Sequence, residues 1–128
     1  MKNNEWKRLF VRHGFYWSDE LCNFVNEYST HTELSFFDNS DQINLLKPAY
    51  IKLGVQYGAY DATSKYLQQR VAPVGDYHGM DVELLLTETG RLIGFCDYLL
   101  ISWGNQHWST AISMILSGDT GFKLGVIP

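Results

Sequence analysis

Acid–base and metal-binding side chains gather near the middle of the chain. The stretch APVGDYHGMDVELLLTETGRLIGFCDYLLISWG begins at Ala72, and its first half contains Asp76, His78, Asp81 and Glu83. Histidine and carboxylate groups are ligands for zinc and for non-haem metals. One candidate activity is therefore that of a small metal-dependent hydrolase that uses Asp76, His78 and Asp81.

The spacing of these residues argues against a metal site. An extended backbone would point Asp76 and His78 to the same side of a strand. Pro73, Gly75 and Gly79 instead predict a backbone that turns here. The other histidines are scattered along the chain and supply no second group of ligands. We expect a polar loop leading into a sheet edge, with no bound metal and no cofactor.

Patterns typical of catalytic nucleophiles do not occur in the chain. It contains no G-x-S-x-G and no S-x-x-K motif, and Cys22 and Cys96 form no C-x-x-C pair. Both cysteines have apolar neighbours, so we expect them to be buried thiols. Asp19 and Glu20 suit the N-terminus of a helix, and Glu88 lies in a predicted hairpin tip. The sequence therefore predicts no catalytic residue.

Length and composition favour one globular domain that spans residues 1–128. The chain has 128 residues, of which 45% are hydrophobic and 15% aromatic. Fourteen acidic and ten basic residues give a formal net charge of −4, which disfavours direct binding to nucleic acid. Its apolar runs are far shorter than the roughly 20 residues that span a bilayer, and the first residues lack the apolar core of a signal peptide. We expect a cytoplasmic protein that does not bind membranes.

Hydrophobic periodicity predicts helices at the start of the chain. The spacing of apolar residues indicates a helix over 6–13 and a second over 19–28, with Ser18 as its N-cap. A strand is predicted over 31–37, and a turn or a single helical turn near 42–48. Alternation of apolar and polar residues favours a half-buried strand over 51–57, although a helix fits the same residues. A helix is expected over 61–71.

The second half of the chain has the pattern of an antiparallel meander. Alternation predicts strands over 82–86, 92–95 and 98–103, with a hairpin connection at 87–91. Helical spacing returns from Trp108 and is expected to end at Gly118. The tail has two readings, an edge strand or a loose segment. The predicted fold class is α+β, in which N-terminal and C-terminal helices pack on one antiparallel sheet.

Acidic and aromatic residues near the ends of these elements form a candidate partner-binding surface. Protein interfaces favour aromatic anchors, and acidic rims attract basic partners. In the alternative reading the aromatic residues fill the core and the carboxylates keep the protein soluble. The candidate contact residues are Asp38, Asp41, Asp61, Asp76, Tyr77, Asp81, Glu83 and Trp103.

The order of short motifs resembles the SUKH superfamily, particularly its third branch. In that branch a Pro-x-Gly turn precedes a strand, a Glu-x-Gly-Arg hairpin follows, and a final helix ends in Leu-x-Gly. This chain has P-V-G at 73–75, E-T-G-R at 88–91, and a final helix with Ala111, Ile115, Leu116 and Gly118. The segment RHGFYWSDELCNFVNEYS also resembles the opening helices of the family.

The resemblance implies an α+β immunity protein of bacteria and their phages. Such a protein binds and neutralises a cognate toxin, often a nuclease of a polymorphic toxin system. Nuclease toxins tend to be basic, so an acidic inhibitor gains association rate by electrostatic steering. The remaining alternatives are the metal-dependent hydrolase and a structural or regulatory interaction subunit.

Overall fold

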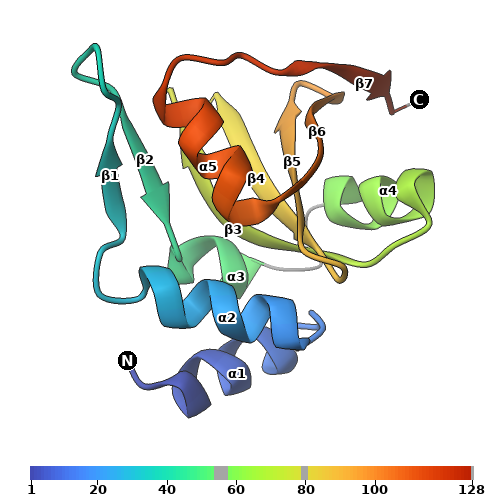
Figure 1. Ribbon diagram of the computed structural model, residues 1–128. Helices are drawn as coiled ribbons and strands as arrows, with labels where there is room; N and C mark the ends of the chain where they lie inside the picture. Colours follow the sequence, from blue (N-terminus) through green and yellow to red (C-terminus); the bar gives the residue numbers. More distant parts are fainter. Residues whose placement is uncertain (54–57, 79–80, 128) are drawn as a thin grey trace.

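A computed structural model describes residues 1–53, 58–78 and 81–127 of the chain (Figure 1). Within these ranges it contains five helices and one seven-stranded antiparallel sheet with strand order β1-β2-β3-β4-β5-β6-β7. This confirms the predicted α+β class. The elements are α1 (Asn3–Arg12), α2 (Asp19–Tyr28), β1 (Glu33–Ser35), β2 (Gln42–Leu45), α3 (Pro48–Leu53), α4 (Gly58–Leu67), β3 (Val71–Tyr77), β4 (Val82–Thr87), β5 (Arg91–Cys96), β6 (Leu99–His107), α5 (Trp108–Leu116) and β7 (Phe122–Val126).

The two N-terminal helices form as their sequences predict. α1 buries Trp6 and Phe10, and its basic and polar residues face outwards. α2 begins after Ser18, whose Oγ accepts a hydrogen bond from the backbone N–H of Leu21 at 3.1 Å. This bond satisfies one of the free N–H groups at the helix start. The predicted positions of both helices are confirmed to within a few residues.

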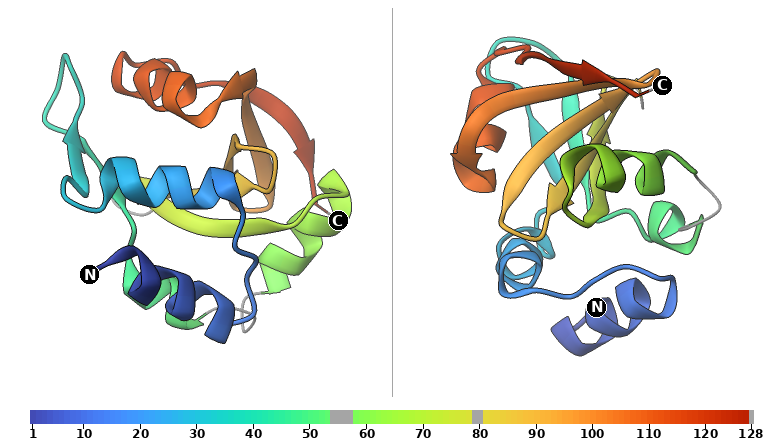
Figure 2. Two further views of the ribbon diagram at one scale, coloured as in Figure 1. Left: turned by 60° about the horizontal axis from the view of Figure 1, so that its bottom comes forward. Right: turned by 90° about the vertical axis from the view of Figure 1, so that its right-hand side faces the viewer.

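Helices cover both faces of the sheet. On one face, buried side chains of α2 and α5 belong to the same core cluster as Val82, Leu84 and Leu86 of β4. On the other face, Tyr60 of α4 packs against Leu85 and the neighbouring strands. Figure 2 shows α4 and α5 on opposite sides of the sheet, with α1 outside α2 and α3. The central strands are therefore buried from both sides.

The predicted turn is wrong for residues 72–77, because these residues belong to the central strand β3. Every residue of β3 is buried, and the strand pairs with both β2 and β4. Strands covered on both faces lack alternation, so the period-2 signal is absent here. Pro73 fits because the register shifts between Pro73 and Gly75. A Cβ at position 75 would come within 2.3 Å of the Asn44 carbonyl oxygen, so glycine allows β2 to approach β3.

Between residues 42 and 57, the prediction of a turn over 42–48 is wrong for Gln42–Leu45, and of the two readings over 51–57 the helix is correct for the described residues. Gln42–Leu45 is a strand, in which Ile43 and Leu45 are buried and the register with β3 is regular. Pro48–Leu53 is a helix, so the favoured strand over 51–57 is wrong for residues 51–53 and the alternative helix is correct there; residues 54–57 lie outside the described residues. Proline at the first helical position is favourable, and Ile51 supplies the buried contact of this short helix.

The C-terminal meander and the final helix are confirmed. Gly90 lies in the β4–β5 turn with φ +95°, and Gly118 follows α5 with φ +94°. Glycine adopts this left-handed conformation without a steric cost. Of the two readings of the tail, the edge strand is correct, since β7 pairs with β6 at the margin of the sheet.

Candidate functional site

Three hairpin turns bring acidic residues to one end of the sheet. The turns joining β1 to β2, β3 to β4 and β5 to β6 lie at the same end because these strands are antiparallel neighbours; it is the upper end in Figure 1. They carry the exposed carboxylates of Asp38, Asp41, Asp81 and Asp97. The described residues of the turns include no lysine or arginine. We call these four aspartates, together with Phe37 and Tyr98, the acidic edge.

Two aromatic side chains of the acidic edge are exposed to solvent. Phe37 is 66% exposed and Tyr98 is 54% exposed. Exposed aromatic groups among charged residues are typical anchors of protein interfaces. Tyr98 and Asp97 both have positive φ, as a two-residue hairpin loop requires. The β5–β6 turn therefore holds both side chains at the tip of the hairpin.

A histidine links the first two turns of the acidic edge. Asp41 Oδ2 lies 3.0 Å from His78 Nδ1. The His78 ring also packs on Phe36 and Tyr77, with ring centroids 5.6 Å and 4.6 Å away. These contacts hold the β1–β2 turn against the end of β3. Asp38, Asp81 and Asp97 form no ion pair with any described residue, so their charges remain available to a partner.

Tyr77 and Trp103 lie beneath the surface and cannot contact a partner. They are 3% and 2% exposed, and their ring centroids are 6.4 Å apart. Burial raises the pKa of Tyr77 to about 12. The indole Nε1 of Trp103 donates to the backbone oxygen of Asp119 at 3.1 Å. Their prediction as surface residues is wrong, because their side chains fill the core between β3, β6 and α5.

Asp76 is likewise wrong as a surface residue, because it is fully buried in β3. Its Oδ2 lies 2.8 Å from Nζ of Lys47, and Asn44 Nδ2 donates to Oδ1 at 3.4 Å. Glu83 is its cross-strand neighbour, is half-buried, and accepts a hydrogen bond from the Tyr60 hydroxyl. Burial raises the pKa of Glu83; the charge of Asp76 adds to this effect and the Tyr60 hydrogen bond opposes it. These carboxylates belong to an internal polar network.

The remaining predicted residues are dispersed. Asp61 is exposed on α4, outside the acidic edge, and pairs with Lys65 at 3.1 Å. The proposed hydrolase residues have separate environments, since Lys47 holds Asp76 and Asp41 holds His78. Across residues 1–53, 58–78 and 81–127, no group of three or more His, Cys, Asp or Glu side chains is arranged to hold a metal ion.

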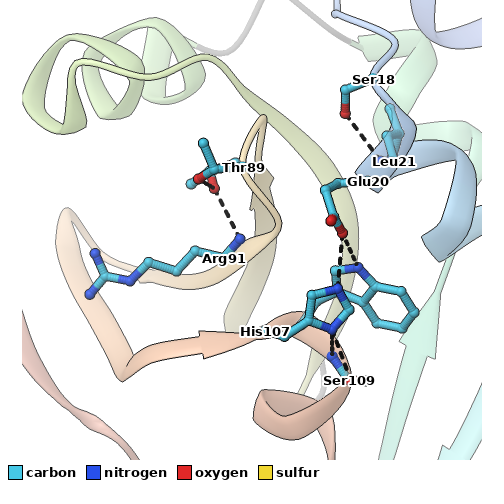
Figure 3. Close-up of polar contacts among 9 residues, drawn as sticks. Ser18, Glu20, Leu21, Thr89, Arg91, His107 and Ser109 are labelled. Carbon is cyan, nitrogen blue, oxygen red and sulfur yellow. Dashed lines mark hydrogen bonds and ion pairs between the residues drawn. The ribbon is translucent and has the colours of Figure 1, made fainter.

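A second polar cluster lies at the start of α5 (Figure 3). Glu20 Oε2 accepts a hydrogen bond from Trp108 Nε1 and lies 2.9 Å from His107 Nε2. His107 Nδ1 accepts from the backbone N–H of Ser109 at 3.3 Å, which places the ring proton on Nε2. Ser109 Oγ is also 2.9 Å from Nδ1. Carboxylate, imidazole and hydroxyl thus form a chain of successive contacts. The imidazole caps the start of α5, so the cluster joins α2 to α5.

Sequence reasoning missed three residues of the acidic edge. The predictions place Phe37 at the end of the strand over 31–37 and Tyr98 at the start of the strand over 98–103, and they place Asp97 in the connection before it, without a role. The signal that could have found them is the pairing of an aromatic residue with aspartate in short turns, FFDNSD and CDYL. Their convergence depends on the order of strands in the sheet, which the sequence pattern does not specify.

Searches against family models, curated proteins and solved structures gave no match to this chain. Among the described residues, no helix combines the length and the apolar character needed to cross a membrane.

Proposed function

We propose that this chain is an immunity protein that binds and neutralises a cognate bacterial toxin, a basic nuclease, through its acidic edge. The observation that carries the proposal is the convergence of three turns. Each brings at least one exposed carboxylate to the same end of the sheet, beside the exposed rings of Phe37 and Tyr98. A surface of this composition suits a partner rich in lysine and arginine.

The dimensions of the acidic edge suit a protein partner. Neighbouring strands lie about 4.8 Å apart, so the three turns spread over roughly 20 Å. Unpaired carboxylates distributed over such a length steer a basic protein during diffusion and raise the association rate. The exposed rings then supply apolar contact once the proteins meet. Inhibition follows if the same carboxylates occupy the positions of substrate phosphates in the nuclease.

The motifs that carry the SUKH resemblance shape the scaffold. P-V-G lies inside β3, where Gly75 allows the close approach of β2. E-T-G-R forms the β4–β5 turn at the other end of the sheet, where Glu88 pairs with Arg70 at 2.7 Å. The motif resemblance therefore supports the proposed function through residues that shape the sheet. The acidic edge supports it through the residues that are exposed to a partner.

Binding to the product of an adjacent toxin gene tests the proposal. The two proteins should form a tight complex and nuclease activity should be lost. Asparagine substitution of Asp38, Asp81 and Asp97 together should slow association about tenfold at low salt, because steering depends on charge. Asparagine is chosen because it tolerates the positive φ of Asp97.

A matched control is Asp61→Asn, which removes an exposed carboxylate outside the acidic edge. It should leave the association rate unchanged. Equal rates for wild type and the triple variant would place the interface elsewhere on the molecule. Failure to bind any toxin encoded by a neighbouring gene would overturn the immunity function itself.

A further inference from the structure

The outward face of α1 is basic in an otherwise acidic protein. Four of the ten lysine and arginine residues lie within the first twelve positions, beside a single acidic residue, Glu5. Lys7, Arg8 and Arg12 are exposed and form no ion pair with a described residue. The protein therefore carries a concentrated positive charge at this helix although its net charge is negative.

Two hollows with apolar side chains lie among these cations. One, of about 310 Å³, is lined by Lys7, Arg8, Val11 and Arg12. The other, of about 240 Å³, is lined by Met1, Glu5, Arg8, Leu9 and Arg12. Val11 is 52% exposed and Met1 is 59% exposed. We call the surface formed by Lys7, Arg8, Val11 and Arg12 the basic face.

The β1–β2 turn of the same protein has the complementary composition. Phe37 stands exposed beside the carboxylates of Asp38 and Asp41. The basic face offers apolar contact at Val11 between Arg8 and Arg12. The turn therefore presents an apolar ring beside carboxylates, and the basic face presents an apolar hollow beside guanidinium groups. The two surfaces are complementary in charge and in apolar character. Among the described residues, Asp38 and the three cations of the basic face form no ion pair, and Asp41 pairs with His78.

The two surfaces lie at opposite ends of the molecule. In Figure 1 the β1–β2 turn is at the top, and α1 is at the bottom beside the N-terminus. They therefore cannot meet within one chain. We propose that they meet between chains: the β1–β2 turn of one copy docks on the basic face of a second copy, with Phe37 against Val11.

The chemistry of the basic face favours a protein over a membrane. An interfacial helix inserts its apolar face into lipid. The apolar face of α1, with Trp6 and Phe10, is already buried in the core. The basic face is also short and interrupted by Val11, whereas a nucleic-acid surface extends its cations along the phosphate backbone. An acidic protein surface with an exposed aromatic residue is complementary to the positive charge of the basic face and to its apolar residue Val11.

A head-to-tail contact leaves one free surface at each end of the assembly. The assembly therefore grows into a chain or closes into a ring. Sedimentation velocity of the full protein at about 50 mM salt should show dimers and larger species as concentration rises. At about 500 mM salt the association should weaken at least about tenfold, because exposed charges are screened. This contact does not depend on the proposed immunity function.

Two variants, each lacking one surface, make the test specific. Arg8→Gln with Arg12→Gln removes two of the three cations of the basic face, the two on either side of Val11, and Asp38→Asn with Asp41→Asn removes both carboxylates of the turn. Each variant alone should remain monomeric where the wild type associates. Mixed in equal amounts they should form a dimer and nothing larger, because each retains the surface that the other lacks. Lys65→Gln, a change of an exposed cation on α4, should associate like wild type.

The outcomes separate the possibilities. A wild type that stays monomeric at low salt and high concentration overturns the proposal. Variants that associate like the wild type, or a mixture that stays monomeric, overturn it as well. Circular dichroism of each variant confirms that the fold is intact. Synthetic vesicles of anionic lipid and a short DNA duplex serve as competitor probes, and binding to either by a wild type that does not self-associate would assign the basic face to that ligand class instead.

Discussion

Lys47 and Asp76 form an ion pair that fastens the start of α3 to the centre of the sheet. The distance from Nζ to Oδ2 is 2.8 Å, and the lysine side chain is 29% exposed whereas the aspartate is fully buried. The loss of one partner therefore has a different consequence from the loss of the other. Removal of Asp76 leaves a lysine that can reach solvent. Removal of Lys47 leaves a buried carboxylate whose remaining hydrogen-bond donor among the described residues is the amide of Asn44.

Lys47→Met should therefore destabilise the protein strongly. An unpaired buried charge costs about 3–5 kcal/mol, and the partial exposure of Lys47 places this pair at the lower end of that range. Urea unfolding at neutral pH measures the change in the free energy of unfolding. Lys65→Met is the control, since its pair with Asp61 is exposed on both sides and contributes less than about 1 kcal/mol. Equal effects of the two substitutions would contradict the structural role of the Lys47–Asp76 pair.

Glu83 should make the stability depend on pH in an unusual direction. Its pKa is raised in the folded protein, chiefly by burial. Ionised Glu83 thus disfavours folding at neutral pH, and this cost disappears as the pH falls through the folded pKa towards the ordinary value. We expect wild type to gain stability relative to Glu83→Gln as the pH is lowered through that range. Chemical unfolding of both proteins at several pH values checks this; a constant difference would show that Glu83 does not titrate in this way.

Glu20 should stabilise the contact between α2 and α5. Its carboxylate accepts a hydrogen bond from the buried Trp108 indole, and Glu20→Ala leaves that N–H without this acceptor. An unsatisfied buried donor costs about 1–3 kcal/mol. Glu20→Gln retains an oxygen acceptor and should lose less. Thermal unfolding of Glu20→Ala and Glu20→Gln measures the two losses of stability. If the Gln variant were as unstable as the Ala variant, the loss would come from the missing charge and not from the missing hydrogen-bond acceptor.

Gly75→Ala should disrupt the pairing of β2 with β3. The added Cβ would come within 2.3 Å of the Asn44 carbonyl oxygen, so one strand must move. We expect a loss of stability of more than about 2 kcal/mol, as for other overpacked core positions. Gly118→Ala is the control because nothing lies within 4 Å of its Cβ, and only the strain of its positive φ of +94° remains, about 1 kcal/mol. Similar losses at both positions would mean that β2 has room to shift.

Phe37 should matter for binding and not for folding. Because its side chain is 66% exposed, Phe37→Ala should change the free energy of unfolding by less than about 0.5 kcal/mol. If the acidic edge binds a toxin, the same change should weaken that complex by at least about tenfold. Phe36→Ala is the comparison: Phe36 is 7% exposed, and its loss should cost about 3 kcal/mol. Calorimetry of unfolding and of binding separates the two effects.

Local patterns in the sequence were enough to predict the outer helices and the C-terminal meander. α1, α2 and α5 have apolar residues at helical spacing, and β4, β5 and β6 are separated by short turns. The class α+β follows from these elements alone. Such features depend on neighbouring residues, so no knowledge of distant contacts was needed.

Only the tertiary structure decided the roles of the polar residues near β3. Pro73, Gly75 and Asp76 have the local preferences of a turn, yet β2, β4 and Lys47 hold them in a buried strand. The acidic edge likewise forms only because the strand order brings three separate turns to one end of the sheet. Both outcomes depend on contacts between residues that are distant in the chain, whereas periodicity reports only on the residues next to each other.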